Sequence, residues 1–74
     1  MEETRYKDLL KTVGNKVRKV RISKGLSMEA TANEANMEYR QLSRIERGEI
    51  NTTITSLAKI ADALKVNIND FFQP

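Results

Sequence analysis

Three residues that tolerate a left-handed backbone divide the middle of this chain into short segments. Gly25, Asn36 and Gly48 are spaced so that about three helical turns fit between neighbours. Glycine adopts positive φ without steric cost, and asparagine does so more readily than most residues. Because such residues end helices, no long helix can run between the two glycines. The sequence therefore predicts two short helices, at about 28–35 and 38–47, joined by a sharp turn at Asn36.

Apolar residues recur at steps of three and four on both sides of this segment. Before it, they predict an amphipathic helix over residues 4–24. After it, Thr53 is a suitable N-cap for a helix over 54–64, and Asn67 for a final short turn or helix. The expected fold class is therefore all-α, a compact bundle of about five short helices.

Gly14 lies inside the first predicted helix, where glycine costs roughly 0.5 to 1 kcal/mol relative to alanine. Either another helix packs closely against it, or the first helix weakens there. We expect one domain, residues 1–74, in which residues 1–12 form an N-terminal extension of the first helix. That extension would either lengthen the helix or build a seam between two subunits through Tyr6, Leu9 and Leu10.

Composition removes several functional classes. The chain has 74 residues with neither cysteine nor histidine, so disulfides, thiolate metal sites and the commonest general base are absent. The acidic residues are accompanied by no glycine-rich phosphate loop and no metal-spaced carboxylates, so no enzyme, metal or cofactor is expected. No apolar run approaches the roughly 18 residues of a membrane span, and the start, Met1-Glu2-Glu3, is unlike a signal peptide. We expect a cytoplasmic protein with no membrane partner.

Positive charge is unevenly distributed along the chain. The formal net charge is only +3, but lysines and arginines crowd residues 16–24 and 40–47. Within 38–47, Leu42 and Ile45 share one helical face, and the basic residues fall on the other. This pattern indicates a one-sided basic surface that could bind nucleic acid, and the alternative is an ordinary solvated helix face.

Three stretches in this order resemble the lambda-repressor-like helix-turn-helix family, also called the XRE or phage-repressor-type family. They are Arg21 followed by Gly25-Leu26-Ser27, then Ser43-Arg44-Ile45-Glu46-Arg47-Gly48, and then Ser56-Leu57 through Ala63-Leu64 with Phe71-Phe72 after it. In length the chain is similar to restriction-modification controller proteins and small phage-type repressors. The resemblance implies a DNA-binding domain whose helix-turn-helix spans residues 28–47 and reads the major groove with its second helix.

The resemblance also implies roles for individual residues. Arg21 and Glu46 match the family's structural ion pair. The positions that match its DNA-contacting sites are Tyr39, Arg40 and Arg44, with Ser43 and Arg47 beside them. We expect base contacts from Tyr39, Arg40, Ser43 and Arg44, and DNA-backbone contacts from Lys16, Lys19, Gln41, Arg47 and Asn51. Arginine suits base reading because its planar fork can donate two hydrogen bonds to guanine. For each residue the alternative is solvated surface.

Several positions depart from the family pattern. Met28 stands where a glutamine usually bonds the DNA backbone, and a thioether cannot donate that bond. Thr31 and Ala35 replace larger aliphatic residues, which predicts less apolar burial on the second helix. Glu38 occupies an N-cap position usually held by serine or threonine, and its charge would face DNA phosphates unless it turns away.

The function implied by the resemblance is a sequence-specific transcriptional regulator that binds an inverted-repeat operator in double-stranded DNA as a homodimer. The C-terminal apolar residues Ile68, Phe71 and Phe72 either close the core or form the dimer interface. RNA polymerase or a cognate protein would be further partners. The alternative function is a protein-interaction module, such as an antitoxin or regulatory subunit, that uses the same apolar segment.

Overall fold

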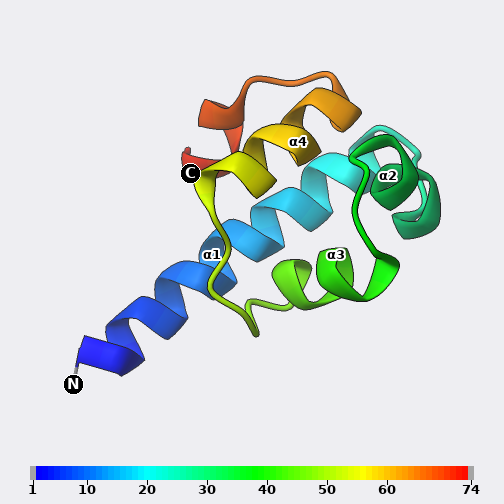
Figure 1. Ribbon diagram of the computed structural model, residues 1–74. Coiled ribbons are helices and arrows are strands. Elements are labelled where there is room, and N and C mark those ends of the chain that lie inside the picture. Colours follow the sequence, from blue (N-terminus) through cyan, green and yellow to red (C-terminus); the bar gives the residue numbers. More distant parts are fainter. Residues whose placement is uncertain (1, 74) are drawn as a thin grey trace.

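The computed structural model describes residues 2–73, which form four α-helices followed by one 3₁₀ helix (Figure 1). Met1 and Pro74, the ends of the predicted domain, lie outside the described residues. The elements are α1 (Glu2–Ser23), α2 (Met28–Glu34), α3 (Tyr39–Glu46), α4 (Ile54–Leu64) and η1 (Ile68–Phe72). The all-α prediction is confirmed, and the fifth predicted helix is a 3₁₀ helix.

The helix ends follow from local side-chain and backbone chemistry. The side-chain oxygens of Ser27, Thr53 and Asn67 accept hydrogen bonds from backbone N–H groups in the first turns of α2, α4 and η1. These three predicted caps are confirmed. Asn36 has φ 55° between α2 and α3, and Gly48 has φ 69° after α3. The short helices and the sharp turn between them are therefore arranged as the sequence predicts.

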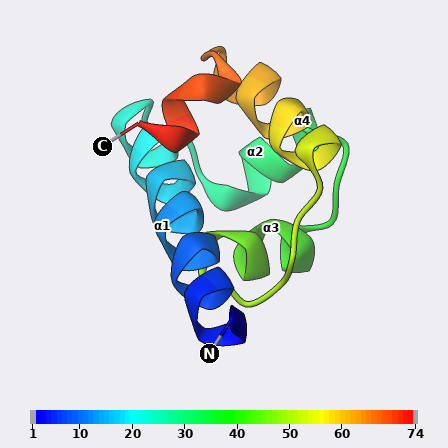
Figure 2. The ribbon, with the colours of Figure 1, turned by 90° about the vertical axis from the view of Figure 1, so that its left-hand side faces the viewer.

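The core forms where α1 packs on α3, α4 and η1, and where α2 packs on α3 and α4. Figure 2 shows α1 along one side of the bundle, with α3 and η1 packed against it at different levels. The largest fully buried apolar side chains come from α1, α3, α4 and η1, and they are Val17, Leu42, Ile60, Leu64 and Phe71. The N-terminal turns of α1 extend beyond the bundle (Figure 1), so Tyr6 and Leu9 stay 56% and 55% exposed.

Phe71 and Phe72 are neighbours with opposite environments. Phe71 is 1% exposed and fills the core, whereas Phe72 is 52% exposed. A side chain enclosed by its own chain offers no surface to a second subunit. The assignment of Phe71 to the dimer interface is therefore corrected, and Phe71 is a core residue.

α2 contributes small residues to the core, as its sequence predicts. Ala32 and Ala35 are buried, and the Thr31 side chain is fully enclosed. Within residues 2–73, the Thr31 hydroxyl has no hydrogen-bond partner. A buried polar group without a partner is destabilising. This position therefore carries a cost that the larger aliphatic residue usual in the family would not have.

Gly14 marks the closest approach between two helices. A Cβ built at Gly14 would lie 2.8 Å from the carbonyl oxygen of Glu46 and would overlap the carbonyl oxygen of Ile45. The end of α3 therefore rests directly on the backbone of α1. Of the two explanations for a glycine inside this helix, close packing is the one observed, since α1 is continuous through residue 14.

Candidate nucleic-acid interface

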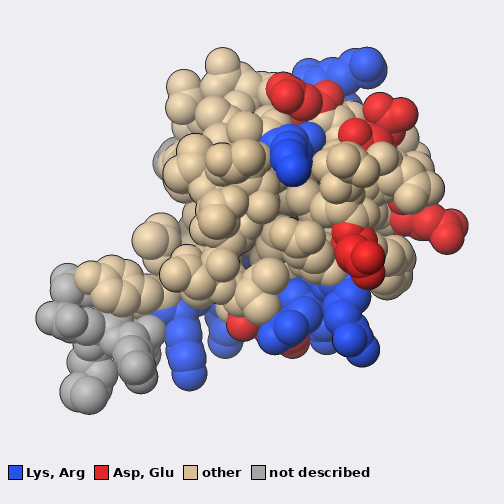
Figure 3. All heavy atoms as spheres, viewed as in Figure 1, with Lys and Arg blue, Asp and Glu red and all other residues tan. Residues whose placement is uncertain are grey.

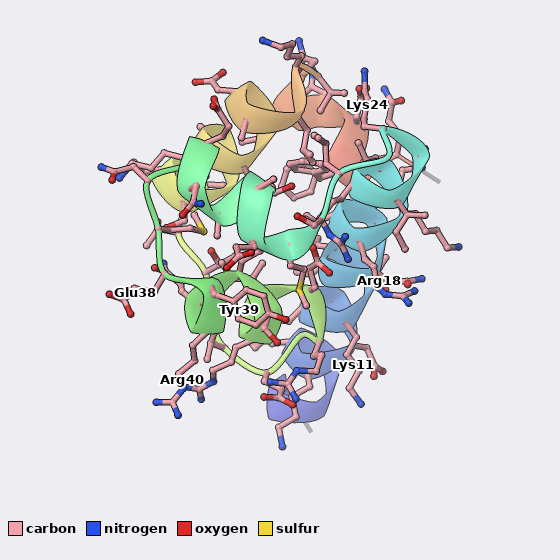
Figure 4. All side chains as sticks on the ribbon, turned by 90° about the vertical axis from the view of Figure 1, so that its right-hand side faces the viewer. Lys11, Arg18, Lys24, Glu38, Tyr39 and Arg40 are labelled. Atoms are coloured by element: carbon pink, nitrogen blue, oxygen red, sulfur yellow. The ribbon has the colours of Figure 1, made fainter. Side chains whose placement is uncertain are left out.

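α3 presents a polar, largely basic face opposite its buried one. Leu42 and Ile45 are buried, while Tyr39 is 53% exposed and Arg40 is exposed. In Figure 4 the Arg40 side chain extends away from the bundle, and Tyr39 lies on the outer surface of α3. Ser43 and Gln41 are half-buried on the flanks of this face. We call the face formed by Tyr39, Arg40, Ser43, Arg44 and Arg47 the α3 face.

Arg44 and Arg47 share one acidic neighbour. Arg44 Nε lies 3.9 Å from Glu49 Oε1, and Arg47 Nη1 lies 3.4 Å from Glu49 Oε2. Arg47 Nε also donates to the Ser43 carbonyl oxygen at 3.4 Å, which holds the Arg47 side chain along the helix. All three charged side chains are about half exposed, so both arginines remain accessible from solvent.

Arg21 and Glu46 form a second arginine–glutamate pair, which is buried. Arg21 Nε and Nη2 donate to the two carboxylate oxygens of Glu46 at 2.6 and 3.0 Å, and Nη1 donates to the Leu26 carbonyl oxygen at 2.8 Å. The bidentate geometry ties the end of α1 to the end of α3. Arg21 is thereby withdrawn from the surface, as its family match implies.

Lys16 and Lys19 do not lie beside the α3 face. Helical spacing places both lysines on the same side of α1 as Thr12. Thr12 and Phe72 of η1 line one hollow. Gly14 marks the side of α1 that meets α3, and helical spacing places Lys16 and Lys19 on the far side from it. Their assignment as DNA-backbone contacts stays a prediction, which this placement on α1 does not favour.

Another cation of α1, Lys11, lies beside the α3 face, and the sequence reasoning missed it. Lys11 is one turn before Gly14, and its backbone touches Gly48 at the end of α3. In Figure 4, Lys11 and Arg40 both reach toward the lower edge of the molecule. Figure 3 shows basic side chains gathered on this lower face, beneath α3 and the adjoining part of α1. The position of Gly14 was the signal that could have identified Lys11.

Two of the residues that depart from the family pattern, Glu38 and Met28, and the expected backbone contact Asn51 have distinct surroundings. Within the described chain, the Glu38 side chain makes no capping hydrogen bond to α3. The Glu38 side chain points sideways from the start of α3 and lies at a separate place from the Arg40 guanidinium (Figure 4). Met28 is partly buried against the core. Asn51 is exposed and lines a hollow with Tyr6, Lys7, Leu9 and Leu10, at the edge of the bundle where α1 projects.

Other kinds of site find no support among residues 2–73. That part of the chain contains no group of three acidic side chains placed to hold a metal ion. It also contains no helix with the length and apolarity needed to cross a membrane.

Comparison with known proteins finds the same domain elsewhere. The Helix-turn-helix family model HTH_3 matches residues 17–71. The control protein C.BamHI of Bacillus amyloliquefaciens is 40% identical over 58 residues, which cover 77% of this chain and 72% of that protein. An HTH-type transcriptional regulator of Sinorhizobium fredii, y4dJ, is 33% identical over 67 residues, covering 90% of this chain and 87% of the relative.

A solved structure extends the similarity to three dimensions. The restriction-modification controller protein C.AhdI from Aeromonas hydrophila superposes with a TM-score of 0.83 at 30% sequence identity. The alignment covers 85% of this chain and 96% of C.AhdI. The similarity therefore extends over nearly the whole length of both chains.

Proposed function

We propose, from the premise that this chain belongs to the helix-turn-helix family HTH_3 of transcriptional regulators, that it binds double-stranded DNA through the α3 face. The observation that carries the proposal is the pair Arg40 and Arg44, both exposed on one side of a helix whose other side is buried. A helix held in this way can enter the major groove and bring its polar side chains to base edges.

The side chains around these arginines suit different parts of the DNA. Arg40 and Arg44 can each donate two hydrogen bonds to guanine, while Tyr39 and Ser43 are placed for neighbouring bases or phosphates. Arg47, Gln41 and Asn51 are proposed backbone contacts. We add Lys11, because its backbone lies against Gly48 at the end of α3 and its side chain extends toward the same lower edge as Arg40 (Figure 4). Such cations supply affinity that does not depend on sequence and falls with salt.

The base-contact proposal predicts that Arg40→Ala and Arg44→Ala each lower the preference for the selected sequence. One bidentate contact contributes roughly 1 to 3 kcal/mol of discrimination, so each variant should lose about 5- to 150-fold in preference. Duplexes selected from a random pool, titrated against each variant, measure this loss. The control is Lys59→Ala, an equal charge change on α4, which should keep the sequence preference of the parent protein. If Arg40→Ala and Arg44→Ala also keep the full preference, the proposal is contradicted.

We further propose that the chain binds an inverted repeat as a homodimer. Two copies on successive DNA turns combine their base contacts, which a single small module cannot match in specificity. The exposed apolar residues that support a dimer surface lie together, because Leu9 of α1 and Phe72 of η1 line the same hollow. A second hollow, on the other flank of Leu9, is lined by Tyr6 and Leu10. Ile68, partly buried against the core, belongs to the same C-terminal segment.

The dimer proposal predicts that Leu9→Asp and Phe72→Asp abolish self-association. Both side chains are more than half exposed, so the monomer fold should tolerate the change, whereas a buried carboxylate in an interface is costly. Sedimentation at micromolar concentration should show twice the chain mass for the parent protein and the chain mass for both variants. Asn33→Asp, which adds a carboxylate to the exposed surface of α2, serves as the control.

A parent protein that stays monomeric with and without DNA would contradict the dimer. The exposed Tyr6, Leu9 and Phe72 would then favour the second function, an interaction module for a cognate protein or RNA polymerase. If such a monomer binds selected DNA through the α3 face, it is a regulator with a further protein partner. If it binds no DNA, it is a module that binds protein alone.

A further inference from the structure

α3 is flanked by two arginine–glutamate contacts of opposite character. The Arg21–Glu46 pair is buried and bidentate, with a shortest N–O distance of 2.6 Å. The contacts of Glu49 with Arg47 and Arg44 are half exposed, at 3.4 and 3.9 Å. Charge-assisted hydrogen bonds are typically about 2.7–2.9 Å long. The Glu49 contacts are therefore longer and more exposed to solvent than the buried pair.

The position of Glu49 is set by the backbone that ends α3. The N–H of Gly48 donates to the Ile45 carbonyl oxygen at 3.0 Å, and the N–H of Glu49 donates to the Arg44 carbonyl oxygen at 2.9 Å. This is the hydrogen-bond pattern with which glycine commonly ends a helix, and Gly48 has the required φ of 69°. The chain therefore turns back on itself and returns Glu49 to the last turn of α3. Its carboxylate is held beside the two arginines by main-chain geometry.

We propose that Glu49 is a built-in competitor of DNA for Arg44 and Arg47, of a guanine edge at Arg44 and of a phosphate at Arg47. The inference rests on the proposed DNA-binding function of the α3 face. A guanidinium recognises carboxylate and phosphate through the same planar fork of donors, so the two anions compete for one arginine. In the free protein Glu49 supplies that anion, and binding to DNA must displace it. Once displaced, the carboxylate remains close to the DNA backbone and repels it.

The competition predicts that Glu49→Gln tightens DNA binding. Glutamine keeps nearly the same shape and removes the charge that screens both arginines. Each exposed ion pair shifts an equilibrium by a few-fold at most, so two pairs and the relief of repulsion predict an increase in affinity of about three- to tenfold. Because these charges are exposed, the gain should shrink as salt concentration rises.

The experiment compares two variants with the same change in net charge. Labelled duplexes of random sequence are titrated with the parent protein, Glu49→Gln and Asp62→Asn, at low and at high salt. Asp62 is exposed on α4 beside Asn67 and Ile68, away from the α3 face. We expect Glu49→Gln to bind several-fold tighter than Asp62→Asn at low salt, and Glu49→Ala to behave as Glu49→Gln does.

A second comparison tests whether the effect passes through the arginines. In an Arg47→Ala background, which removes the shorter contact, the gain from Glu49→Gln should fall toward the gain from Asp62→Asn. An undiminished gain in that background, or equal affinities of Glu49→Gln and Asp62→Asn, would overturn the role of Glu49 while leaving DNA binding intact. A parent protein that binds no duplex at low salt would overturn both proposals.

Discussion

Replacing Glu46 by alanine should remove a large part of the free energy of unfolding. The change leaves the Arg21 guanidinium enclosed without its carboxylate, although the bond to the Leu26 carbonyl oxygen remains. Breaking a fully buried pair from one side typically costs about 3–5 kcal/mol, and the lower end applies here because Arg21 keeps one partner. A domain of this length is stabilised by roughly 4–11 kcal/mol in total. Urea unfolding followed by circular dichroism measures the loss.

Glu49→Ala is the matched control for this prediction. It removes an acidic side chain close to the end of the same helix, but its ion pairs are half exposed and contribute at most about 1 kcal/mol. A double variant, Arg21→Met with Glu46→Leu, should recover most of the stability, because no unpaired charge stays buried. A Glu46→Ala variant as stable as Glu49→Ala would show that the buried pair contributes little.

The parts of this fold that the sequence predicts well depend on neighbouring residues alone. Ser27, Thr53 and Asn67 each accept a bond from an N–H two or three residues ahead, so their capping roles require no tertiary information. Asn36 and Gly48 likewise have the positive φ values that their residue types indicate. Helix boundaries and the turn between α2 and α3 could therefore be predicted from local chemistry.

The errors concern which face of a helix meets which neighbour. Periodicity identifies an apolar stripe on α1, but it does not say which flank lies beside α3. That choice depends on the close contact at Gly14, which brings Lys11 to the end of α3. Helical spacing places Lys16 and Lys19 on the opposite side of α1. The available signal was Gly14, a glycine inside an otherwise regular helix. The side of α1 that carries this glycine is the side on which α3 packs.

Two further details required the three-dimensional structure. In a 3₁₀ helix successive side chains point about 120° apart, so only one of Phe71 and Phe72 can enter the core. The sequence contains no feature that selects between them, and the choice follows from how η1 lies on α1. Glu49 follows the predicted helix end at Gly48, and only the turn at Gly48 brings its carboxylate to Arg44 and Arg47.

The contact at Gly14 leads to the second large effect, destabilisation by Gly14→Ala. Alanine should by itself favour the helix by about 1 kcal/mol. Its methyl group, however, would overlap backbone carbonyl groups of Ile45 and Glu46, which cannot move away without displacing the end of α3. Overpacking typically costs about 1–3 kcal/mol and occasionally more, and rigid backbone on both sides places this site at the upper end. We expect a net loss of about 2 kcal/mol in urea unfolding.

The neighbouring position supplies the control, because Asn15 lies on the same helix but is exposed. Asn15→Ala should leave stability unchanged or raise it slightly, through helix propensity alone. Displacing the end of α3 also shifts Glu46 relative to Arg21, so Gly14→Ala and Glu46→Ala should not be additive when combined. A Gly14→Ala protein as stable as Asn15→Ala would mean that α1 and α3 can separate without cost. In that case the position of the α3 face would not depend on this contact.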